Sequence, residues 1–276
     1  GIMVDYIVVA QPGNQFQTEN TEYNPAFSGD TKVPLDAVTA LPLDARKVIA
    51  RRAAMELVPS AVLNLGVGIP VNVATVGAEE GISDQLVLTT EAGSIGGVPA
   101  GLRDFGHAFN SEAIMDHHAQ FDFYDGGGLD LSVLGLAQAE GCGGFINISQ
   151  AAKKLVFAGT FTAGGLQQEV KDGRLTIIQE GKAKKFVAEV EQVTFSGEYA
   201  SEVEQEVLYV TERAVFDLEK GNLRLIEIAP GVDLEKDILG QMGFKPVIAD
   251  DLKVMNEGMF RENWGELKNI VMTNGK

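Results

Sequence analysis

The sequence has few of the residues that disulfide-bonded, metal-binding or membrane-spanning proteins need. One cysteine, Cys142, excludes a disulfide within the chain of 276 residues and suits a reducing compartment, so we expect a cytoplasmic location. The histidines His107, His117 and His118 show no metal-ligand spacing, and we expect no resident metal. Neither an apolar run of about 18 residues nor a basic segment leading into an apolar one is present, so we expect no membrane helix and no secretory signal.

Basic residues are also scarce. The chain has 22 Lys and Arg against 39 Asp and Glu, which gives a formal net charge of −17. This acidic balance argues against nucleic acid or an anionic membrane as the main partner. A small anionic ligand remains compatible with it, because backbone N–H groups or a local basic cluster can hold one. Hydrophobic residues and glycines, by contrast, are abundant. The 45% of hydrophobic residues predict a globular core. The 32 glycines predict places where the backbone runs close to other groups.

The apolar patterning predicts one α/β domain. Its first part should hold a mostly parallel sheet with covering helices, and its later part antiparallel strands. Strands over Ala61–Pro70 and Gln85–Glu91, with a helix from Pro70 to about Ala78 between them, form a parallel crossover unit. Hairpin turns are expected at Asp172–Gly173 and Lys220–Gly221, the latter between two strands within Glu206–Ile228. The other expected elements are strands over Met3–Ala10, Leu129–Gln138 and Lys153–Phe161 and helices over Leu43–Leu57 and Asp233–Met242.

The strongest candidate for chemistry is an acid at a strand end. Glu91 lies in the stretch LTTEAGSIGGVPAG, and the turn Gly66–Gly68 closes the preceding strand. A right-handed crossover would place both at the carboxyl edge of the sheet, where ligands of α/β folds gather. A carboxylate there can act as general base, metal ligand or nucleophile, and Gly and Ala neighbours let an acyl group approach. A glutamate that only caps a loop is the structural alternative.

Other motifs are incomplete. GSIGG does not have the nucleophile-elbow spacing around Ser94, and Cys142 has no visible base or cation beside it. LGVGIPVN has Val71 where the third glycine of a dinucleotide fingerprint belongs. Its strand–turn–helix geometry still offers N–H groups to an oxyanion or phosphate. The aromatic stretch over Phe121–Gly127 is expected to pack in the core rather than to line a pantetheine groove.

Several motifs in order resemble the family I CoA-transferases, most closely the fused acetate/propionate (short-chain acyl) type, from about Met3 to Phe260. They are NLGVGIP, LTTEAGSIGGVPAG, FDFYDGGGLDLSVLGLAQ, GCGGFINIS, GTFTAGG, EGKAKKFV and EIAPGVDLEKDIL. The resemblance implies a ping-pong transfer of CoA between carboxylic acids such as acetate, propionate, butyrate and acetoacetate, through a glutamyl-CoA thioester. It implies no cofactor beyond the substrate coenzyme A.

The resemblance also assigns roles to residues. By motif match the glutamate is Glu91. The turn of Gly66, Val67 and Gly68 would supply backbone N–H groups beside the thioester. Gly143 and Gly144 match a glycine-rich segment that contacts CoA or the oxyanion.

The resemblance further implies a domain organisation and partners. Fused members carry a second α/β half ahead of this one, so residues 1–35 are expected to be the end of an N-terminal half with a connecting loop, and 36–276 the C-terminal catalytic domain. We expect the chain to work with that half, fused or as a partner chain, and to form a homo-oligomer. Its ligands would be acyl-CoA and small carboxylic acids. The family has a further short segment where Gln138 here leads to Gly141 through two residues. Either this protein lacks the segment or its residues are missing from the numbered sequence, so loop contacts to CoA are not carried over there.

The remaining expectations concern a basic cluster that could contact CoA and three functions other than CoA transfer. Lys182 and Lys184, in QEGKAKKF, could meet CoA phosphates, while a solvated turn is the structural alternative. An acyl-CoA hydrolase of the same fold would use water in place of the acceptor acid. A sugar-phosphate isomerase of similar fold would use the strand-end glutamate to abstract a proton next to a carbonyl. A non-catalytic ligand-binding half is the third.

Overall fold

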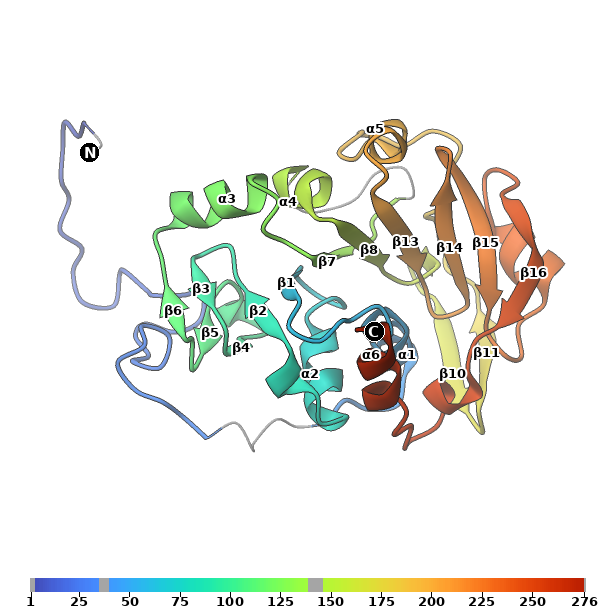
Figure 1. The fold of residues 1–276 in the computed structure, drawn as a ribbon, viewed down its shortest axis with the longest axis horizontal. Coiled ribbons are helices and arrows are strands. Elements are labelled where there is room, and N and C mark those ends of the chain that lie inside the picture. The colour runs from blue at the N-terminus through green and yellow to red at the C-terminus, as the bar shows by residue number, and fades with distance from the viewer. Residues whose placement is uncertain (1–2, 35–39, 139–145, 276) are drawn as a thin grey trace.

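The computed structural model describes residues 3–34, 40–138 and 146–275. It confirms the α/β class, because one large sheet carries helices on both faces (Figure 1). In spatial order the strands of this sheet are β16 (Val247–Val254), β15 (Asn222–Ile228), β14 (Ala214–Glu219), β13 (Glu206–Val210), β8 (Lys154–Ala158), β7 (Leu131–Gly135), β1 (Val62–Leu65), β2 (Val87–Thr89), β3 (Ser94–Ile95) and β6 (Ala113–Ile114).

The sheet has a parallel centre, an antiparallel flank at β3 and β6, and a mixed flank in which β14 and β15 are antiparallel and the edge strand β16 is parallel to β15. Strands β2, β1, β7, β8 and β13 all run in one direction. The later part is mainly antiparallel, as expected, through β13–β14–β15 and a separate hairpin of β10 (Gln167–Lys171) and β11 (Arg174–Gln179) that turns at Asp172–Gly173. Glu206–Ile228 holds three strands and not two. Two short antiparallel strands, β3 and β6, also extend the sheet beyond β2, a feature that the sequence patterning did not indicate.

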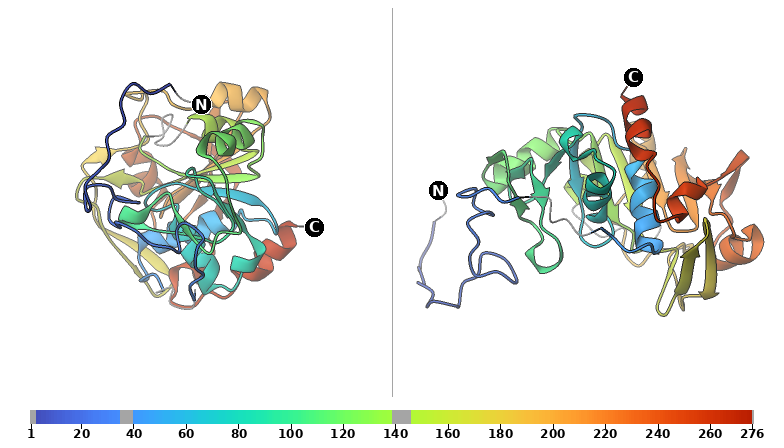
Figure 2. Two further views of the ribbon diagram at one scale, coloured as in Figure 1. Left: turned by 90° about the vertical axis from the view of Figure 1, so that its left-hand side faces the viewer. Right: turned by 90° about the horizontal axis from the view of Figure 1, so that it is seen from below.

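Helices cover the two faces of the sheet and create two cores (Figures 1 and 2). The helices α1 (Ala45–Ala54), α2 (Asn72–Glu79) and α6 (Leu267–Asn274) pack on one face, and α3 (His117–Asp125), α4 (Ile146–Ala151) and α5 (Gly197–Glu202) on the other. Alternate residues of a strand point to opposite faces. Leu63 therefore shares the α1–α2 face with its paired neighbours Leu88 and Leu131, whereas the next residues along the three strands are polar and face α3.

Local sequence signals explain where the main helices begin. The Asp44 carboxylate accepts the N–H of Lys47 at 3.0 Å and caps α1. Pro70 precedes α2, where its missing N–H removes no helical bond. Asp233 likewise accepts the N–H of Lys236 at 2.7 Å, and the expected helix there is a π-helical turn over Leu234–Ile238 followed by a 3-10 turn.

One expected element is wrong. Met3–Ala10 forms no strand but runs extended and exposed away from the body of the molecule (Figure 1). Met3 is 99% and Val8 89% exposed. A strand needs a neighbour for its N–H and C=O groups, and the described part of the chain pairs no strand with this segment. The expected domain boundary at residues 35 and 36 lies outside the described residues.

Two pairs of short antiparallel strands lie outside the large sheet. They are β9 (Thr162–Ala163) with β12 (Ala183–Lys184) and β4 (Val98–Pro99) with β5 (Ala108–Phe109).

Candidate active site

The carboxyl ends of the parallel strands meet at one edge of the sheet. Because β1 and β2 are parallel neighbours, the turn Gly66–Gly68 after β1 lies beside Thr90 and Glu91 after β2. The ends of β7 and β8 continue the same edge on the other side of β1. The structure thus brings Glu91 and the glycine turn together at the place where ligands of α/β sheets bind.

Only part of that turn is available to an oxyanion. The N–H of Gly66 already donates to the carbonyl oxygen of Val133 at 2.8 Å. Within the described residues the N–H groups of Val67 and Gly68 have no such acceptor, and Gly68 adopts a positive φ of 87°. Of the three residues expected to supply N–H groups, Val67 and Gly68 are therefore the two with a donor to offer.

Glu91 is partly buried and has no ion-pair partner in the described part of the chain. Burial raises the pKa of the Glu91 carboxyl, since the charged form loses hydration, and the nearby Asn64 amide and His117 oppose that rise. A carboxylate with a raised pKa is a better base and nucleophile than an ordinary glutamate. A perturbed acid of this kind at a strand end is a candidate for catalysis.

The glycines that follow Glu91 have a structural reason of their own. At Gly93, which has a φ of 114°, a side chain would collide with the backbone oxygen of Met115. At Gly97 it would collide with the oxygen of Phe109. These glycines let the chain after β2 cross closely over later segments. Room for an acyl group is therefore not the main reason for the bare side chains at Gly93 and Gly97.

Beneath Glu91, on the face covered by α3, lies a row of buried polar side chains that sequence reasoning missed. Asn64 of β1 pairs in register with Thr89 of β2 and with Ser132 of β7, and all three are at most 2% exposed. The hydroxyl of Tyr124, from α3, donates to Thr89 Oγ1 at 2.9 Å. The sequence does contain a signal for this row, because each of the three strands has a polar residue directly after a leucine at the same register.

The lysines of the basic cluster have different surroundings in the structure. Lys182 is exposed, and Lys184 donates from Nζ to the carbonyl oxygens of Gly240 and Met242 at 3.0 and 3.1 Å, a structural use. Lys185 instead reaches the sheet edge, where its Nζ donates to Leu136 O at 3.1 Å. Burial lowers the pKa of Lys185, which the charge of Glu212 opposes.

Lys185 lines a pocket of about 260 Å³ at this edge. The rest of the wall is apolar and comes from the glycine turn and the ends of β7 and β8: Val67, Ile69, Pro70, Gly135, Leu136, Ala137, Ala158 and Gly159. No carboxylate of the described residues forms an ion pair with Lys185. An apolar wall with a single cation fits an anionic ligand that has an apolar part.

Two expected site residues and one cysteine cannot be placed. Gly143, Gly144 and Cys142 lie outside the described residues. Among the residues that are described, no group of three or more His, Cys, Asp or Glu side chains could hold a metal ion. Of the aromatic stretch on α3, Tyr124 is fully buried as expected, whereas Phe123 is partly exposed.

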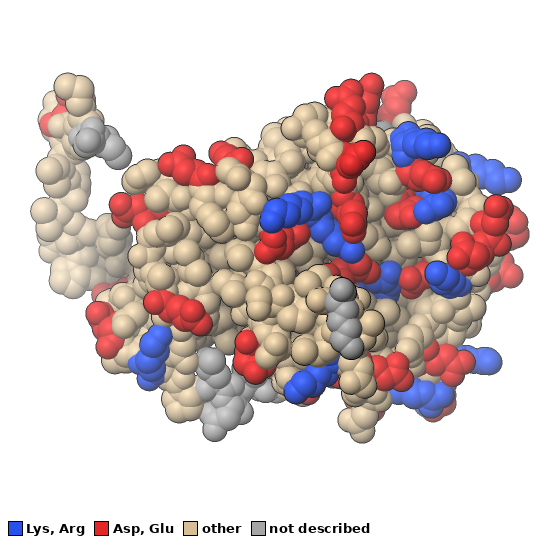
Figure 3. Space-filling model, viewed as in Figure 1, with Lys and Arg blue, Asp and Glu red and all other residues tan. Residues whose placement is uncertain are grey.

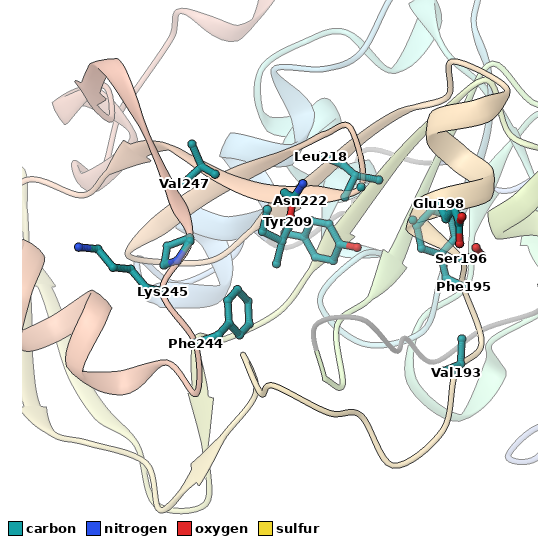
Figure 4. Close-up of a pocket in the computed structure, with 14 residues that line it drawn as sticks. Val193, Phe195, Ser196, Glu198, Tyr209, Leu218, Asn222, Phe244, Lys245 and Val247 are labelled. Atoms are coloured by element: carbon teal, nitrogen blue, oxygen red, sulfur yellow. The ribbon is translucent and has the colours of Figure 1, made fainter.

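A separate cavity of about 430 Å³ lies in the antiparallel part (Figure 4). It is lined by residues of α5, β13, β14, β15 and the start of β16 and by the segments that lead into α5 and β16, among them Phe195, Leu218 and Phe244. None of its lining residues belongs to the edge that carries Glu91. On the face shown in Figure 3, most of the visible basic side chains lie over its right-hand half, interspersed with acidic ones. Each helix of the described chain is too short or too polar to cross a bilayer.

Comparisons with known proteins give a consistent result. The chain is 51% identical to the caffeate CoA-transferase of Acetobacterium woodii, over 98% of this chain and 56% of that protein. Its fold matches the crystal structure of the Escherichia coli O157:H7 acyl-CoA transferase YdiF in a thioester complex with CoA, with a TM-score of 0.80 and 43% identity over 90% of this chain and 50% of that one.

A third relative is shorter. The acetate CoA-transferase subunit beta of Haemophilus influenzae is 28% identical over 77% of this chain and 96% of its own length. The chain thus spans about half the length of the curated relatives that it matches at 46–51% identity. No protein-family model matches it.

Proposed function

This chain is homologous to CoA-transferases over nearly its whole length, and on that premise we propose that it is the part of a CoA-transferase that carries the nucleophile, Glu91. The observation that supports this most directly is the partly buried Glu91 carboxylate at the strand-end edge, without an ion-pair partner among the described residues and beside the unpaired N–H groups of Val67 and Gly68. An acid placed in this way can attack a carbonyl carbon.

The proposed reaction has two exchanges on Glu91. A Glu91 oxygen attacks the acyl-CoA carbonyl carbon, the C–S bond breaks, and a mixed anhydride and the CoA thiolate result. The thiolate then attacks the Glu91 carbonyl carbon and displaces the acid as its carboxylate, which leaves a Glu91–CoA thioester. An acceptor carboxylate reverses both steps. The N–H groups of Val67 and Gly68 stabilise the oxyanion on the acyl carbon.

Substrate and partners follow from the same premise. The apolar pocket beside Lys185 suits an anion with an apolar part, and we assign to the enzyme short-chain carboxylic acids of the acetate, propionate, butyrate and acetoacetate class together with their CoA thioesters. Since this chain spans about half of its longer relatives, we assign to it a complementary half, fused or separate, and assembly into a homo-oligomer. We call the two halves together the complete enzyme.

Intact mass spectrometry tests the role of Glu91. After incubation with acetyl-CoA, the complete enzyme should gain the mass of CoA less water, and peptide mapping should place it on Glu91. Glu91→Ala should abolish the adduct and lower turnover by at least about 10³-fold, as loss of a covalent nucleophile does. Glu202→Ala, at an exposed position of α5, is the matched control. Full turnover of Glu91→Ala would refute the proposal. Turnover without an added acceptor acid would show a hydrolase instead.

A further inference from the structure

A second pocket opens at the glycine turn, on the side of α2 and β4. Its volume is about 370 Å³, and Val67 and Gly68 of the turn line it. Val67 and Ile69 also line the pocket beside Lys185, so the two pockets meet at the turn. The N–H groups of Val67 and Gly68 are the donors that we assign to the acyl oxygen. A substrate whose carbonyl group binds there can therefore extend to both sides of the turn.

Two walls of different origin enclose this second pocket. Val71 and Thr75, four residues apart at the start of α2, share one helix face and form the first wall. Val98 of β4 and Phe105 form the second wall, and Figure 1 shows β4 beside α2 and β2. The charged residue among the described lining residues, Arg46 of α1, is exposed. A mainly apolar pocket without a buried charge suits the carbon chain of an acid.

The second wall is held from behind by an N-terminal part of the chain. Residues 13–33, which we call the strap, form turns and bends that lie against the segment around β4 and β5 (Figure 1). The Asp104 carboxylate accepts the hydroxyl protons of Thr18 at 2.5 Å and of Thr21 at 2.8 Å. Because Asp104 directly precedes Phe105, these two hydrogen bonds hold the backbone that carries the Phe105 ring.

Other contacts of the strap fix the hairpin of β4 and β5. Phe27 is 4% exposed, and its ring packs against that of Phe109 with the centroids 4.8 Å apart. Phe109 of β5 pairs in register with Val98 of β4. Asn110, the residue after β5, exchanges two hydrogen bonds with the backbone of Val33, at 2.8 and 2.7 Å. Packing and hydrogen bonds to the strap therefore define where this wall of the pocket lies.

We propose that this pocket holds the carbon chain of the acyl group, that Thr75, Val98 and Phe105 set the size of the acids accepted, and that the strap positions the second wall. The inference rests on the function proposed above. The volume is far larger than a methyl group needs, since pockets of about 300–1,000 Å³ hold drug-sized ligands. A longer or aromatic chain covers apolar walls that acetate would leave in contact with water. The enzyme should therefore prefer such acids to acetate.

A series of acceptor acids tests the size preference. With one acyl-CoA donor, kcat/KM of the complete enzyme should rise from acetate to butyrate to 3-phenylpropionate, by about fourfold for each methylene group that enters the pocket. Thr75→Phe, which fills the pocket from α2, should remove the preference and leave kcat/KM for acetate within about threefold of wild type. Thr273→Phe, at an exposed position of α6, is the matched control. A flat series in the wild type, or an unchanged preference in Thr75→Phe, overturns the inference.

A variant of the opposite wall keeps the test valid if Thr75→Phe does not fold. Phe105→Ala enlarges the pocket and should shift the ratio of kcat/KM values toward the aromatic acid by about threefold or more. An unchanged ratio in Phe105→Ala overturns the assignment of this residue to specificity.

The same ratio of kcat/KM values tests the strap. Asp104→Ala removes the acceptor of Thr18 and Thr21, and it should lower the preference for butyrate over acetate by about threefold with little change in kcat for acetate. Arg103→Ala, which removes an exposed ion pair with Glu19, is the matched control. A lower Tm for Asp104→Ala with an unchanged preference would show that the strap only stabilises the fold.

Binding measured without turnover separates this inference from the proposed function. In calorimetry, 3-phenylpropionate should bind the complete enzyme at least about tenfold more tightly than it binds Thr75→Phe. If the wild type takes up no CoA at Glu91, the proposed function fails, and this titration still decides whether the pocket binds apolar acids. If the wild type takes up CoA but both proteins bind 3-phenylpropionate equally, the pocket assignment alone is overturned.

Discussion

Two glutamates at the ends of parallel strands have opposite surroundings. Glu212 follows β13 and is fully buried, with Arg213 Nε 2.9 Å from Oε1 and the Phe161 N–H donating to Oε2 at 2.9 Å. Glu91 follows β2, is only partly buried, and has no ion pair with a described residue. Burial raises the pKa of both carboxyls. At Glu212 the positive charge of Arg213 opposes this rise in pKa.

The comparison shows that the position of an acid at a strand end does not by itself assign a function to it. Both acids lie at carboxyl ends of strands in the same sheet, so that position alone does not make a nucleophile. The oxygens of Glu212 are engaged by fixed donors, and Arg213 extends the network to Glu180 Oε2 at 2.7 Å. Glu91 has no cation as a fixed partner among the described residues, which suits the attack on a carbonyl carbon that we propose for it. An acid without an ion-pair partner at a strand end is a candidate for function. A buried acid with a cation partner belongs to the structure, because removal of its partner destabilises the fold.

Breaking the Glu212 pair should have the largest effect on stability. Arg213→Met leaves the fully buried Glu212 carboxylate and the partly buried Glu180 carboxylate without their cation, and we expect a loss of about 3–5 kcal/mol in the free energy of unfolding. Urea unfolding at neutral pH measures this loss. Arg224→Met, which removes a partly exposed pair with Asp217 at 2.6 Å, is the matched control and should cost far less. Equal losses in the two variants would contradict the structural role of Arg213.

The same contrast between paired and unpaired groups applies to two basic residues, Arg213 and Lys185. Unlike Arg213, it has no carboxylate partner in the described chain and lines the pocket at the Glu91 edge. Lys185→Met should raise the KM for an anionic substrate by about tenfold and change kcat little, because a charge-assisted hydrogen bond is worth about 1.5–3 kcal/mol. Steady-state kinetics of the complete enzyme measures this effect.

The control for Lys185 is its neighbour. Lys184→Met removes an amine that bonds to carbonyl groups of the fold, and it should leave KM unchanged. Acyl-pantetheine has no nucleotide phosphates and identifies the anion that Lys185 binds. A KM effect that disappears with this substrate assigns Lys185 to CoA phosphate, and one that persists assigns it to the carboxylate. Equal KM values for wild type and Lys185→Met would remove Lys185 from the site.

The fold was largely predictable because strand and helix signals here are local. The crossover unit before Glu91, the hairpin at Asp172–Gly173 and the helical turn that begins at Asp233 each depend on a few adjacent residues. The strand over Met3–Ala10 was wrong for the opposite reason. Its apolar, β-branched residues favour an extended backbone, but a strand also needs a partner, and a local pattern carries no information about one.

The candidate site was predictable in part. The strand-end position of Glu91 and of the glycine turn followed from the crossover rule. The engagement of the Gly66 N–H with Val133, the row from Asn64 to Tyr124 and the choice of Lys185 over its neighbours depend on register and on contacts between distant segments. Asn64 and Tyr124 are 60 residues apart in numbering, and only the packing of α3 against the sheet brings them together.

The smallest expected effect concerns stability and pH at Glu91 itself. Because burial raises the folded-state pKa of Glu91, the folded protein holds this proton more tightly than the unfolded chain. Stability from this group is present below the ordinary glutamate pKa and is lost as pH rises through the raised one. Glu91→Gln should therefore raise Tm at neutral pH, and the gain should vanish once the pH falls below the ordinary pKa of a glutamate. Calorimetry across this range measures the change. Glu212→Gln should lower Tm at neutral pH, since it removes one of the two carboxylate partners of buried Arg213. A gain of similar size in both variants would show that the two acids do not differ.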